Sequence, residues 1–224
     1  MEASKGKKLR LKYEKTSMAK YVSHLDLAAA MHRAFLRADV PLKYSSGFNP
    51  HPYISVALPL KVGDESLCEL LDFAVSDDFA PDESLSERLS GVMAKGLRAV
   101  DVYMPTRKFS EIAWIDLQGV LYYNQMQRGL VSGLTKRFSQ QSIIITKKTK
   151  SGLSDIDIKP HVLDVEFKEL ADGINISIKI SAVNPSLNSE NLLSALKDEY
   201  KWLMPDFYKF TRTEFYDSSL TVFK

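Results

Sequence analysis

The sequence predicts an α+β protein made of two ferredoxin-like α/β-sandwich subdomains with antiparallel sheets. Two observations predict this fold class. Residues 9–104 show the order strand, helix, strand, strand, helix, strand, and residues 114–216 roughly repeat it. With 224 residues, 45% of them hydrophobic, the chain can form two such cores. We therefore expect an N-terminal subdomain over residues 1–105 and a C-terminal α+β subdomain over residues 111–224, joined by a short polar, basic segment.

The first strand and the first helix follow from hydrophobic periodicity. Leu9, Leu11 and Tyr13 alternate with charged residues, which predicts a strand with one core face and one charged face. A helix should begin at Ser23, because its hydroxyl can accept from an amide of the first turn and Asp26 can complete a capping box in the usual place of Glu. The helix should be amphipathic, with a basic outer face and an apolar stripe at Leu27, Met31, Ala34, Phe35 and Ala38.

A rigid loop at residues 41–52 should follow this helix. Its prolines fix φ, remove amide donors and push the residues before them out of helical geometry. Such loops, held on a firm scaffold, are where recognition residues tend to lie. The next segment is typical of a hairpin, with strands at residues 53–58 and 70–75 and a turn at residues 61–64.

The rest of the chain continues this pattern. Pro81 and Asp82 should open a helix with Leu85, Leu89, Val92 and Met93 on one side. The elements expected after it are, in order, a strand at 99–104, a strand at 114–123, a helix at 125–138 and a strand at 142–146. A break at residues 150–152 should separate these elements from the last third of the chain.

The clearest hairpin in the sequence pairs residues 162–167 with residues 174–180. Asp172 and Gly173 between them favour a turn that accepts positive φ, and four isoleucines line one face of the return strand. A helix should follow Asn188, and a strand at residues 208–216 should close the fold.

Three ordered motifs in the first half resemble the DUF2344 family of radical SAM-linked proteins. They are Tyr-x-Ser-His-Leu-Asp-Leu at residues 21–27, Leu-x-Tyr-Ser-x-Gly-Phe-Asn-Pro-His-Pro at residues 42–52, and Ser-x-Ala-Leu-Pro-Leu-x-Val-Gly-x-Glu-Ser with a following Leu-Asp at residues 55–72. Residues 191–196 and 211–216 resemble that family's closing helix and strand more weakly. The resemblance implies a protein encoded beside, or fused to, a cobalamin-binding radical SAM protein, often near genes for RNA and ribosome work. It does not imply a particular reaction.

Cysteine content assigns any radical chemistry to another chain. Cys68 is the only cysteine, so no disulfide can form within the chain, and an iron–sulfur cluster needs several thiolates. We therefore expect no cofactor and no metal bound by this chain. Nothing in the sequence approaches the ~20 consecutive apolar residues of a membrane span. These observations favour a cytoplasmic protein without a membrane partner.

The charges are unevenly spread, although the net charge is only +2. Residues 5–15 hold six basic residues and one acid, residues 136–150 hold five basic residues and no acid, and residues 64–87 hold nine acids and no base. The plainest interpretation of each run is solvated surface. The basic runs also suit a polyanionic partner such as RNA.

The candidate ligand-binding residues lie at the start of the first helix and in the rigid loop. His24 lies in the first helical turn, where the dipole favours a neutral, proton-accepting ring that would suit a general base. The alternative is that His24 only packs on apolar neighbours and Asp26 only caps the helix. Gly47 and Phe48 could place an amide and an aromatic face against a nucleotide, or could serve loop geometry alone. The full candidate set is Ser23, His24, Asp26, Arg33, Tyr44, Ser45, Gly47, Phe48, Asn49 and His51.

A metal site at His24, Asp26 and His51 is a further possibility, because two histidines and a carboxylate can hold a transition metal. If residues 42–45 are only loop, the chain places His24 and His51 at opposite ends of the sheet. If these residues form an additional strand, the two histidines come to the same end. Scattered single histidines are weak evidence, so we expect no metal.

The residues and the resemblance together favour a non-catalytic accessory protein of a cobalamin-dependent radical SAM enzyme that binds RNA, transfer or ribosomal, for modification. The expected partners are thus a B12-binding radical SAM protein and RNA. Two alternatives stay open. One is an RNA-processing enzyme with His24 as general base and Lys43 or Arg33 stabilising phosphate charge. The other is a pure protein–protein adaptor.

Overall fold

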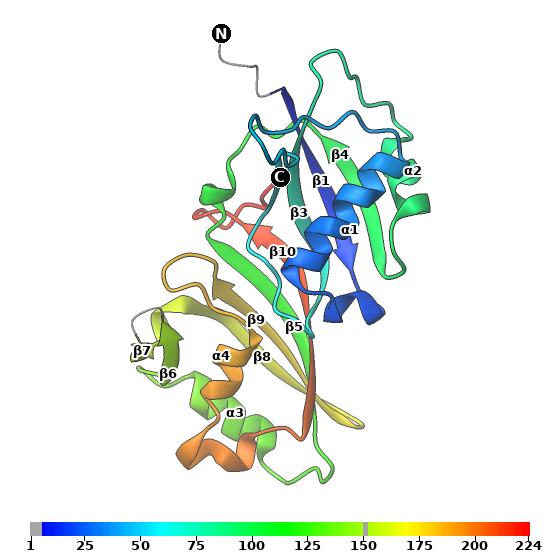
Figure 1. Cartoon of the computed structure of the whole chain (residues 1–224). Helices are drawn as coiled ribbons and strands as arrows, with labels where there is room; N and C mark the ends of the chain where they lie inside the picture. Colours follow the sequence, from blue (N-terminus) through cyan, green and yellow to red (C-terminus); the bar gives the residue numbers. More distant parts are fainter. Residues whose placement is uncertain (1–5, 150–151) are drawn as a thin grey trace. The chain divides into compact units, whose positions relative to one another are not determined.

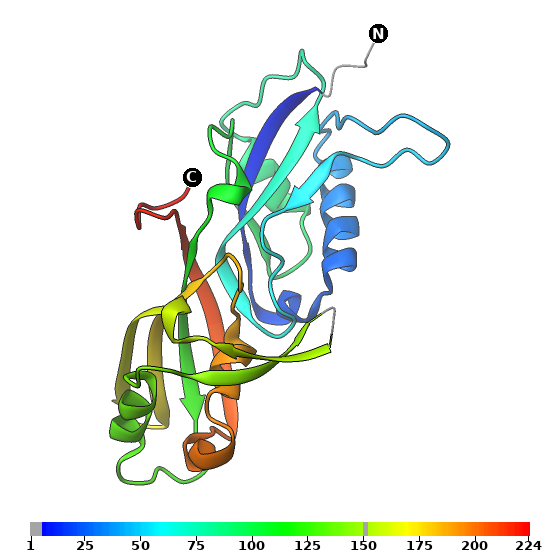
Figure 2. The ribbon, with the colours of Figure 1, turned by 90° about the vertical axis from the view of Figure 1, so that its left-hand side faces the viewer.

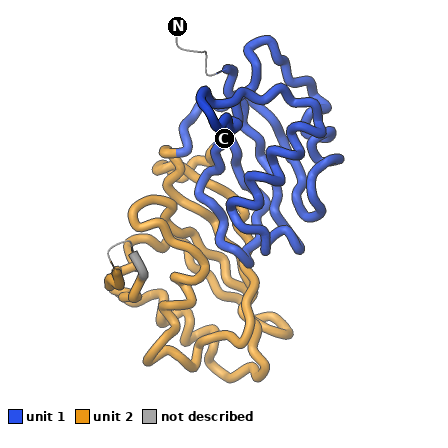
Figure 3. Tube along the Cα trace, viewed as in Figure 1, with its two compact units in different colours: residues 1–109, 224 blue, residues 110–223 orange. Residues whose placement is uncertain are grey.

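The computed structural model describes residues 6–149 and 152–224 and divides the chain into two compact units (Figures 1 and 3). Unit 1 comprises Met1–Phe109 with Lys224, and unit 2 comprises Ser110–Phe223. Each unit combines antiparallel strands with helices, which confirms the α+β class.

Unit 1 has four antiparallel strands in the spatial order β4-β1-β3-β2. They are β1 (Lys7–Lys15), β2 (Ile54–Val56), β3 (Glu65–Val75) and β4 (Leu97–Tyr103). The predicted hairpin is confirmed, since β2 pairs with β3. In β1, Leu9, Leu11 and Tyr13 are fully buried as predicted.

The expectation of a charged, solvated face on β1 is wrong in part. Arg10 is 0% exposed and Lys15 is 2% exposed, so two of the six basic residues of the run at 5–15 are buried. Arg10 is paired with Asp72 and Lys15 donates to the carbonyl oxygen of Val22 at 2.9 Å. Lys5 lies outside the described residues. The rule that charges face solvent fails here because each buried cation has a polar partner.

Two helices, α1 (His24–Arg37) and α2 (Leu85–Val92), cover one face of the sheet of unit 1 (Figure 1). The predicted stripe of α1 is buried against β1 and β3, and the ring centroids of Phe35 and Phe73 lie 4.4 Å apart. Ser23 caps α1 by accepting from the amide of Asp26 at 3.2 Å. The second half of the predicted capping box differs, because the Asp26 carboxylate accepts from the hydroxyl of Ser23 rather than from its amide.

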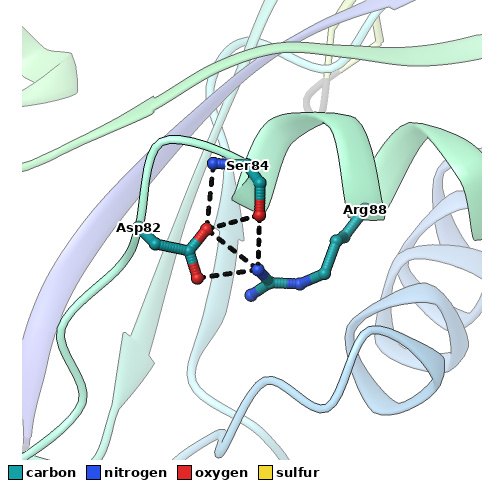
Figure 4. Close-up of polar contacts among 3 residues, drawn as sticks. All are labelled: Asp82, Ser84 and Arg88. Carbon is teal, nitrogen blue, oxygen red and sulfur yellow. Dashed lines mark hydrogen bonds and ion pairs between the residues drawn. The ribbon is translucent and has the colours of Figure 1, made fainter.

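The start of α2 is organised by Asp82 (Figure 4). Its carboxylate accepts from the amide of Ser84 at 2.9 Å, from the hydroxyl of Ser84 at 2.6 Å and from Arg88 at 2.7 Å. The hydrogen bond from Ser84, followed by that from Arg88, lowers the pKa of Asp82 from 3.8 to about 2. The carboxylate therefore favours the folded helix start only while it is ionised.

We expect Asp82→Asn to lower protection of the α2 amides from hydrogen exchange above about pH 4, and the difference from the wild type to disappear only as the pH falls below about 2. The folded pKa lies below the unfolded one, so the contribution is complete above the unfolded value and is lost as the pH falls through the folded value. Asp78→Asn, which changes another exposed acid of this region, is the matched control. Equal protection of the wild type and Asp82→Asn in mildly acidic solution would contradict this role.

Unit 2 also has four antiparallel strands, in the order β10-β5-β9-β8. They are β5 (Trp114–Tyr122), β8 (Val162–Leu170), β9 (Gly173–Ser181) and β10 (Phe207–Tyr216). The hairpin of β8 and β9 is confirmed, and its core face carries Ile174, Ile176, Ile178 and Ile180, none more than 3% exposed.

A second, two-stranded sheet of unit 2 was only half predicted. The expected strand at residues 142–146 is β6 (Ile144–Thr149). It pairs with β7 (Gly152–Asp157), a strand that was not predicted and that follows the predicted break at residues 150–152. β7 reads Gly-Leu-Ser-Asp-Ile-Asp and is almost wholly exposed, so its sequence shows little of the apolar alternation that marks a half-buried strand. Lys150, the last of the second basic run, lies outside the described residues.

The helices of unit 2 are α3 (Leu130–Phe138) and α4 (Ser189–Ser194). α3 begins five residues later than predicted, because Gly129 at its start adopts a left-handed conformation with φ 88° and ends the preceding exposed loop. Asn188 caps α4, and Asn188 and Asn191 each bond the backbone amide of the other. Short 3-10 helices lie at Ser17–Tyr21, Phe109–Glu111, Lys159–His161 and Asp198–Leu203. No helix in the described part of the chain is long and apolar enough to cross a membrane.

Candidate functional site

The predicted rigid loop projects from unit 1 (Figure 2), and backbone hydrogen bonds join the two sides of its stem. The amide of Ser45 donates to the carbonyl oxygen of His51 at 2.9 Å, and the amide of Tyr53 donates to the carbonyl oxygen of Lys43 at 3.0 Å. The stem is anchored to the sheet because the amide of Lys43 also donates to the carbonyl oxygen of Ala74 at 2.8 Å. The loop conformation is therefore fixed from its base.

The tip of this loop presents an aromatic ring to solvent. Gly47 has φ 121°, a conformation that side chains other than glycine rarely adopt, and it turns the chain. Phe48, the next residue, is fully exposed. Below the tip, the hydroxyl of Ser45 lies 2.9 Å from Nδ1 of His51 and accepts from the amide of His51 at 3.1 Å. These bonds close the loop directly beneath Phe48 and Asn49.

Tyr44 ties the loop to α1. Its hydroxyl lies 2.8 Å from Nε2 of His32, and the two rings meet edge to face with centroids 5.8 Å apart. Tyr44 therefore supports the loop, although the residue stays 40% exposed.

A pocket of about 370 Å³ lies at the foot of the loop, on the face of the unit 1 sheet that the helices do not cover. Along each strand, successive side chains point to opposite faces, so neighbours of the buried Leu9 and Phe73 face away from the helices. The register places Lys8 beside Ala74 and Ser55 beside Asp72 on this open face. The polar side chains that line the pocket are Lys8, His51, Tyr53, Ser55 and Asp72.

The charge at the floor of the pocket comes from a buried ion pair. Asp72 is 3% exposed and accepts from Nε of Arg10 at 2.6 Å and from Nη2 of Arg10 at 3.1 Å. Arg10 also donates to the carbonyl oxygen of Arg107 at 2.9 Å and stacks on Phe109, 4.3 Å from the ring centroid. This fork-to-carboxylate geometry fixes both groups.

Lys8 is the cation that the pocket offers to a ligand. Its ammonium lies 2.7 Å from Oδ2 of Asp72, and its side chain is 59% exposed. Arg10 already balances the charge of Asp72, so Lys8 adds a net positive charge at the rim. An anionic group bound in the pocket would therefore meet a lysine held in place by a buried carboxylate.

The helix-start residues are not part of this site. Lys15, at the end of β1, bonds the backbone beside Ser23, whereas His51 shares the pocket with Lys8 near the start of β1. The seven-residue step between these lysines is roughly 23 Å long at about 3.3 Å per residue. His24 and Asp26 are therefore at the opposite end of unit 1 from the loop, so the candidate residues of the helix start and those of the loop do not come together in one site.

Arg33 is exposed along α1, between these two ends. Residues 42–45 contribute only single bridges, from Leu42 to Val75 and from Tyr44 to Pro52, which agrees with the loop alternative. The possible site of two histidines and a carboxylate is not assembled, and the described residues contain no group of three or more His, Cys, Asp or Glu that could hold a metal ion.

Sequence reasoning missed Lys8, Tyr53, Ser55 and Asp72 as parts of a site. One signal was available, because Asp72 interrupts the apolar run of residues 70–75 and a carboxylate in a buried strand needs a partner. The partner itself, Arg10, lies 62 residues away and no local pattern identifies it.

Comparison with known proteins extends the resemblance over most of the chain. Residues 8–194 match the model of a family described as "Uncharacterized protein conserved in bacteria (DUF2344)". No curated protein matches the chain.

Proposed function

The chain belongs to the DUF2344 family, and from this premise we propose that it is a non-catalytic accessory protein that binds RNA for a cobalamin-dependent radical SAM enzyme. The RNA would be transfer or ribosomal RNA, and the location would be the cytoplasm. The observation that carries the RNA-binding part is the exposed ring of Phe48, held on a closed loop above a pocket with a lysine at its rim.

This arrangement suits single-stranded RNA for two reasons. Unstacked bases lie flat on aromatic rings, and each such contact contributes about 1–3 kcal/mol. The phosphate between two bases requires a cation nearby, which Lys8 provides. The stem of the loop holds Phe48 before RNA arrives, so binding orders few additional groups.

We further infer that each unit is a ferredoxin-like fold, with the β6–β7 hairpin inserted in unit 2. Numbered within its unit, each sheet has the strand order 4-1-3-2, and the elements alternate as in that fold. In unit 1 both helices cover one face and leave the other for a ligand. Folds of this kind often bind RNA, which is support by analogy only.

The radical chemistry is assigned to the partner protein. Cys68, the only cysteine, is buried in β3, and a lone thiol cannot bind an iron–sulfur cluster. The alternative of an RNA-processing enzyme receives little support from the geometry. His24 is exposed and, in the described residues, no side chain bonds its ring to orient it as a general base.

The affinity for single-stranded RNA is expected to fall linearly with salt on a logarithmic plot, because binding releases counterions. Lys8→Ala should reduce the slope by about 0.7, the value for one contact to a single strand. Lys95→Ala removes an exposed lysine from the other end of unit 1 and is the matched control. Fluorescence anisotropy with a labelled oligonucleotide measures both. Absent binding, or binding indifferent to salt, counts against the proposal and favours a protein adaptor.

A further inference from the structure

We infer that unit 2 contains a second binding site, a pocket beside Trp202 that takes a nucleobase of single-stranded RNA. The pocket has a volume of about 340 Å³, within the range of small-ligand sites. It lies where β5 ends and where the 3-10 helix Asp198–Leu203 leads into β10. It shares no residue with the site of unit 1.

Trp202 is a half-exposed side chain whose ring packs against α3. Its side chain is 49% exposed, yet its six-membered ring lies on Gly133 of α3. A Cβ at Gly133 would be 2.4 Å from Cη2 of Trp202 and 2.8 Å from its Cζ2, so only glycine allows the ring this close approach. A ring that is packed along one edge and exposed elsewhere is suited to stacking on a base.

The backbone beside Trp202 is anchored by Tyr123, the residue that follows β5. The hydroxyl of Tyr123 donates to the carbonyl oxygen of Leu203 at 2.8 Å. Burial raises the pKa of Tyr123 to about 12, so this donor keeps its proton at neutral pH. The wall of the pocket is thus formed before a ligand binds, which lowers the entropic cost of binding.

The rest of the lining supplies groups that read the edge of a base. Asn124, Gln125 and Gln127 lie on the exposed loop before α3, and each carries an amide with donors and an acceptor. The carboxylate of Asp206 accepts a hydrogen bond from the backbone N–H of Asn124 at 2.8 Å. Asp206 therefore holds the start of this loop in place. Lys201 is the only cation among the described lining residues.

This chemistry favours a nucleobase over other ligands. A base has one flat apolar face and an edge that mixes donors with acceptors, which matches a tryptophan beside neutral amides. A strongly anionic ligand would need more than one cation, and an apolar ligand would leave three amides unpaired. A base that is part of a strand also brings a phosphate, which Lys201 can meet.

The test uses the intrinsic fluorescence of Trp202 in the full chain. The sequence contains two tryptophans, so Trp114→Phe leaves Trp202 as the only indole. Titration with a short single-stranded oligoribonucleotide, and separately with nucleoside monophosphates, should quench this signal saturably. Anisotropy of a labelled oligonucleotide then measures affinity in variants without the indole, each in a Phe48→Ala background so that the loop of unit 1 does not contribute. Trp202→Ala should weaken it about 5- to 150-fold, and Trp202→Phe should restore part of that loss.

Two further variants separate recognition from simple packing. Gln125→Ala with Gln127→Ala changes only exposed amides and should lower the affinity about 5-fold or more at unchanged stability. Gly133→Ala should also weaken binding, because the added Cβ displaces the ring. Quenching by the oligoribonucleotide that is absent or not saturable overturns the site. So does a double glutamine variant that is quenched with the same affinity as the parent chain. An unrelated peptide that quenches Trp202 as strongly as the oligoribonucleotide also overturns it.

The outcome does not depend on the site of unit 1. Phe48→Ala in the same Trp114→Phe background should leave the quenching by mononucleotides unchanged. If RNA fails to bind unit 1 but quenching of Trp202 persists, the proposed function of the loop fails and the pocket of unit 2 stands. If RNA binds unit 1 but Trp202 is not quenched, only the proposed site in unit 2 fails.

Discussion

Replacing Asp72 by alanine is expected to destabilise unit 1 by about 3–5 kcal/mol, because it removes the carboxylate that accepts two hydrogen bonds from the buried guanidinium of Arg10. Arg10 is 0% exposed and cannot turn toward water without disrupting β1. The bond from Arg10 to the carbonyl oxygen of Arg107 remains, but a neutral acceptor does not compensate a buried cation. Native-state hydrogen exchange of the β1 and β3 amides measures the effect within unit 1.

Lys8→Ala is the matched control for this variant. Lys8 contacts the same carboxylate but is 59% exposed, so its loss should cost less than about 1 kcal/mol. Replacing both buried partners, with Arg10→Met and Asp72→Leu together, should cost less than Asp72→Ala alone, since no charge is left buried. Wild-type exchange rates in Asp72→Ala would show that the pair is not needed for folding.

Replacing Phe48 by alanine is expected to weaken binding of single-stranded RNA about 5- to 150-fold without changing stability. The reason is that the ring is fully exposed and contributes nothing to the core, while it offers the only fully exposed aromatic face near the pocket in the described part of unit 1. Phe48→Trp should keep most of the affinity, because it keeps a stacking surface. Anisotropy with a labelled oligonucleotide measures the affinities, and thermal unfolding checks the fold.

Leu25→Ala is the control for loss of an exposed apolar side chain. Leu25 is 80% exposed in the first turn of α1, at the end of unit 1 away from the loop. Its replacement should leave RNA binding unchanged. Equal losses in Phe48→Ala and Leu25→Ala would mean that the loop tip does not contact RNA, and unchanged affinity in both would mean the same.

Most of the secondary structure could be predicted from local patterns. The alternation in β1, the capped start and apolar stripe of α1, and the hairpin of β8 and β9 each depend on residues that are close in sequence. The misses also have local causes. β7 is exposed on both faces and so shows little alternation, and the left-handed Gly129 delays the start of α3 beyond the point that residue composition suggests.

The candidate site could be predicted only in part, because its parts meet through long-range strand pairing. The loop at residues 42–52 was identified from its prolines and its glycine. The floor beneath it depends on the register of β1 with β3, which places Arg10 beside Asp72. His24 and His51 flank the same helix and loop in sequence, yet the direction of α1 separates them. No periodicity in the sequence shows whether these two histidines lie far apart or close together in the fold.

The bonds between Ser45 and His51 mean that the tip of the projecting loop is closed by residues of the loop itself. This closure joins partners six residues apart, while the stem below it is anchored to the sheet and to α1. Under the proposed function, substitutions at Ser46, Phe48 or Asn49 should thus change ligand recognition without a penalty to folding. Under the proposed function, the affinity for a ligand and the stability of the fold therefore depend on different residues of this loop.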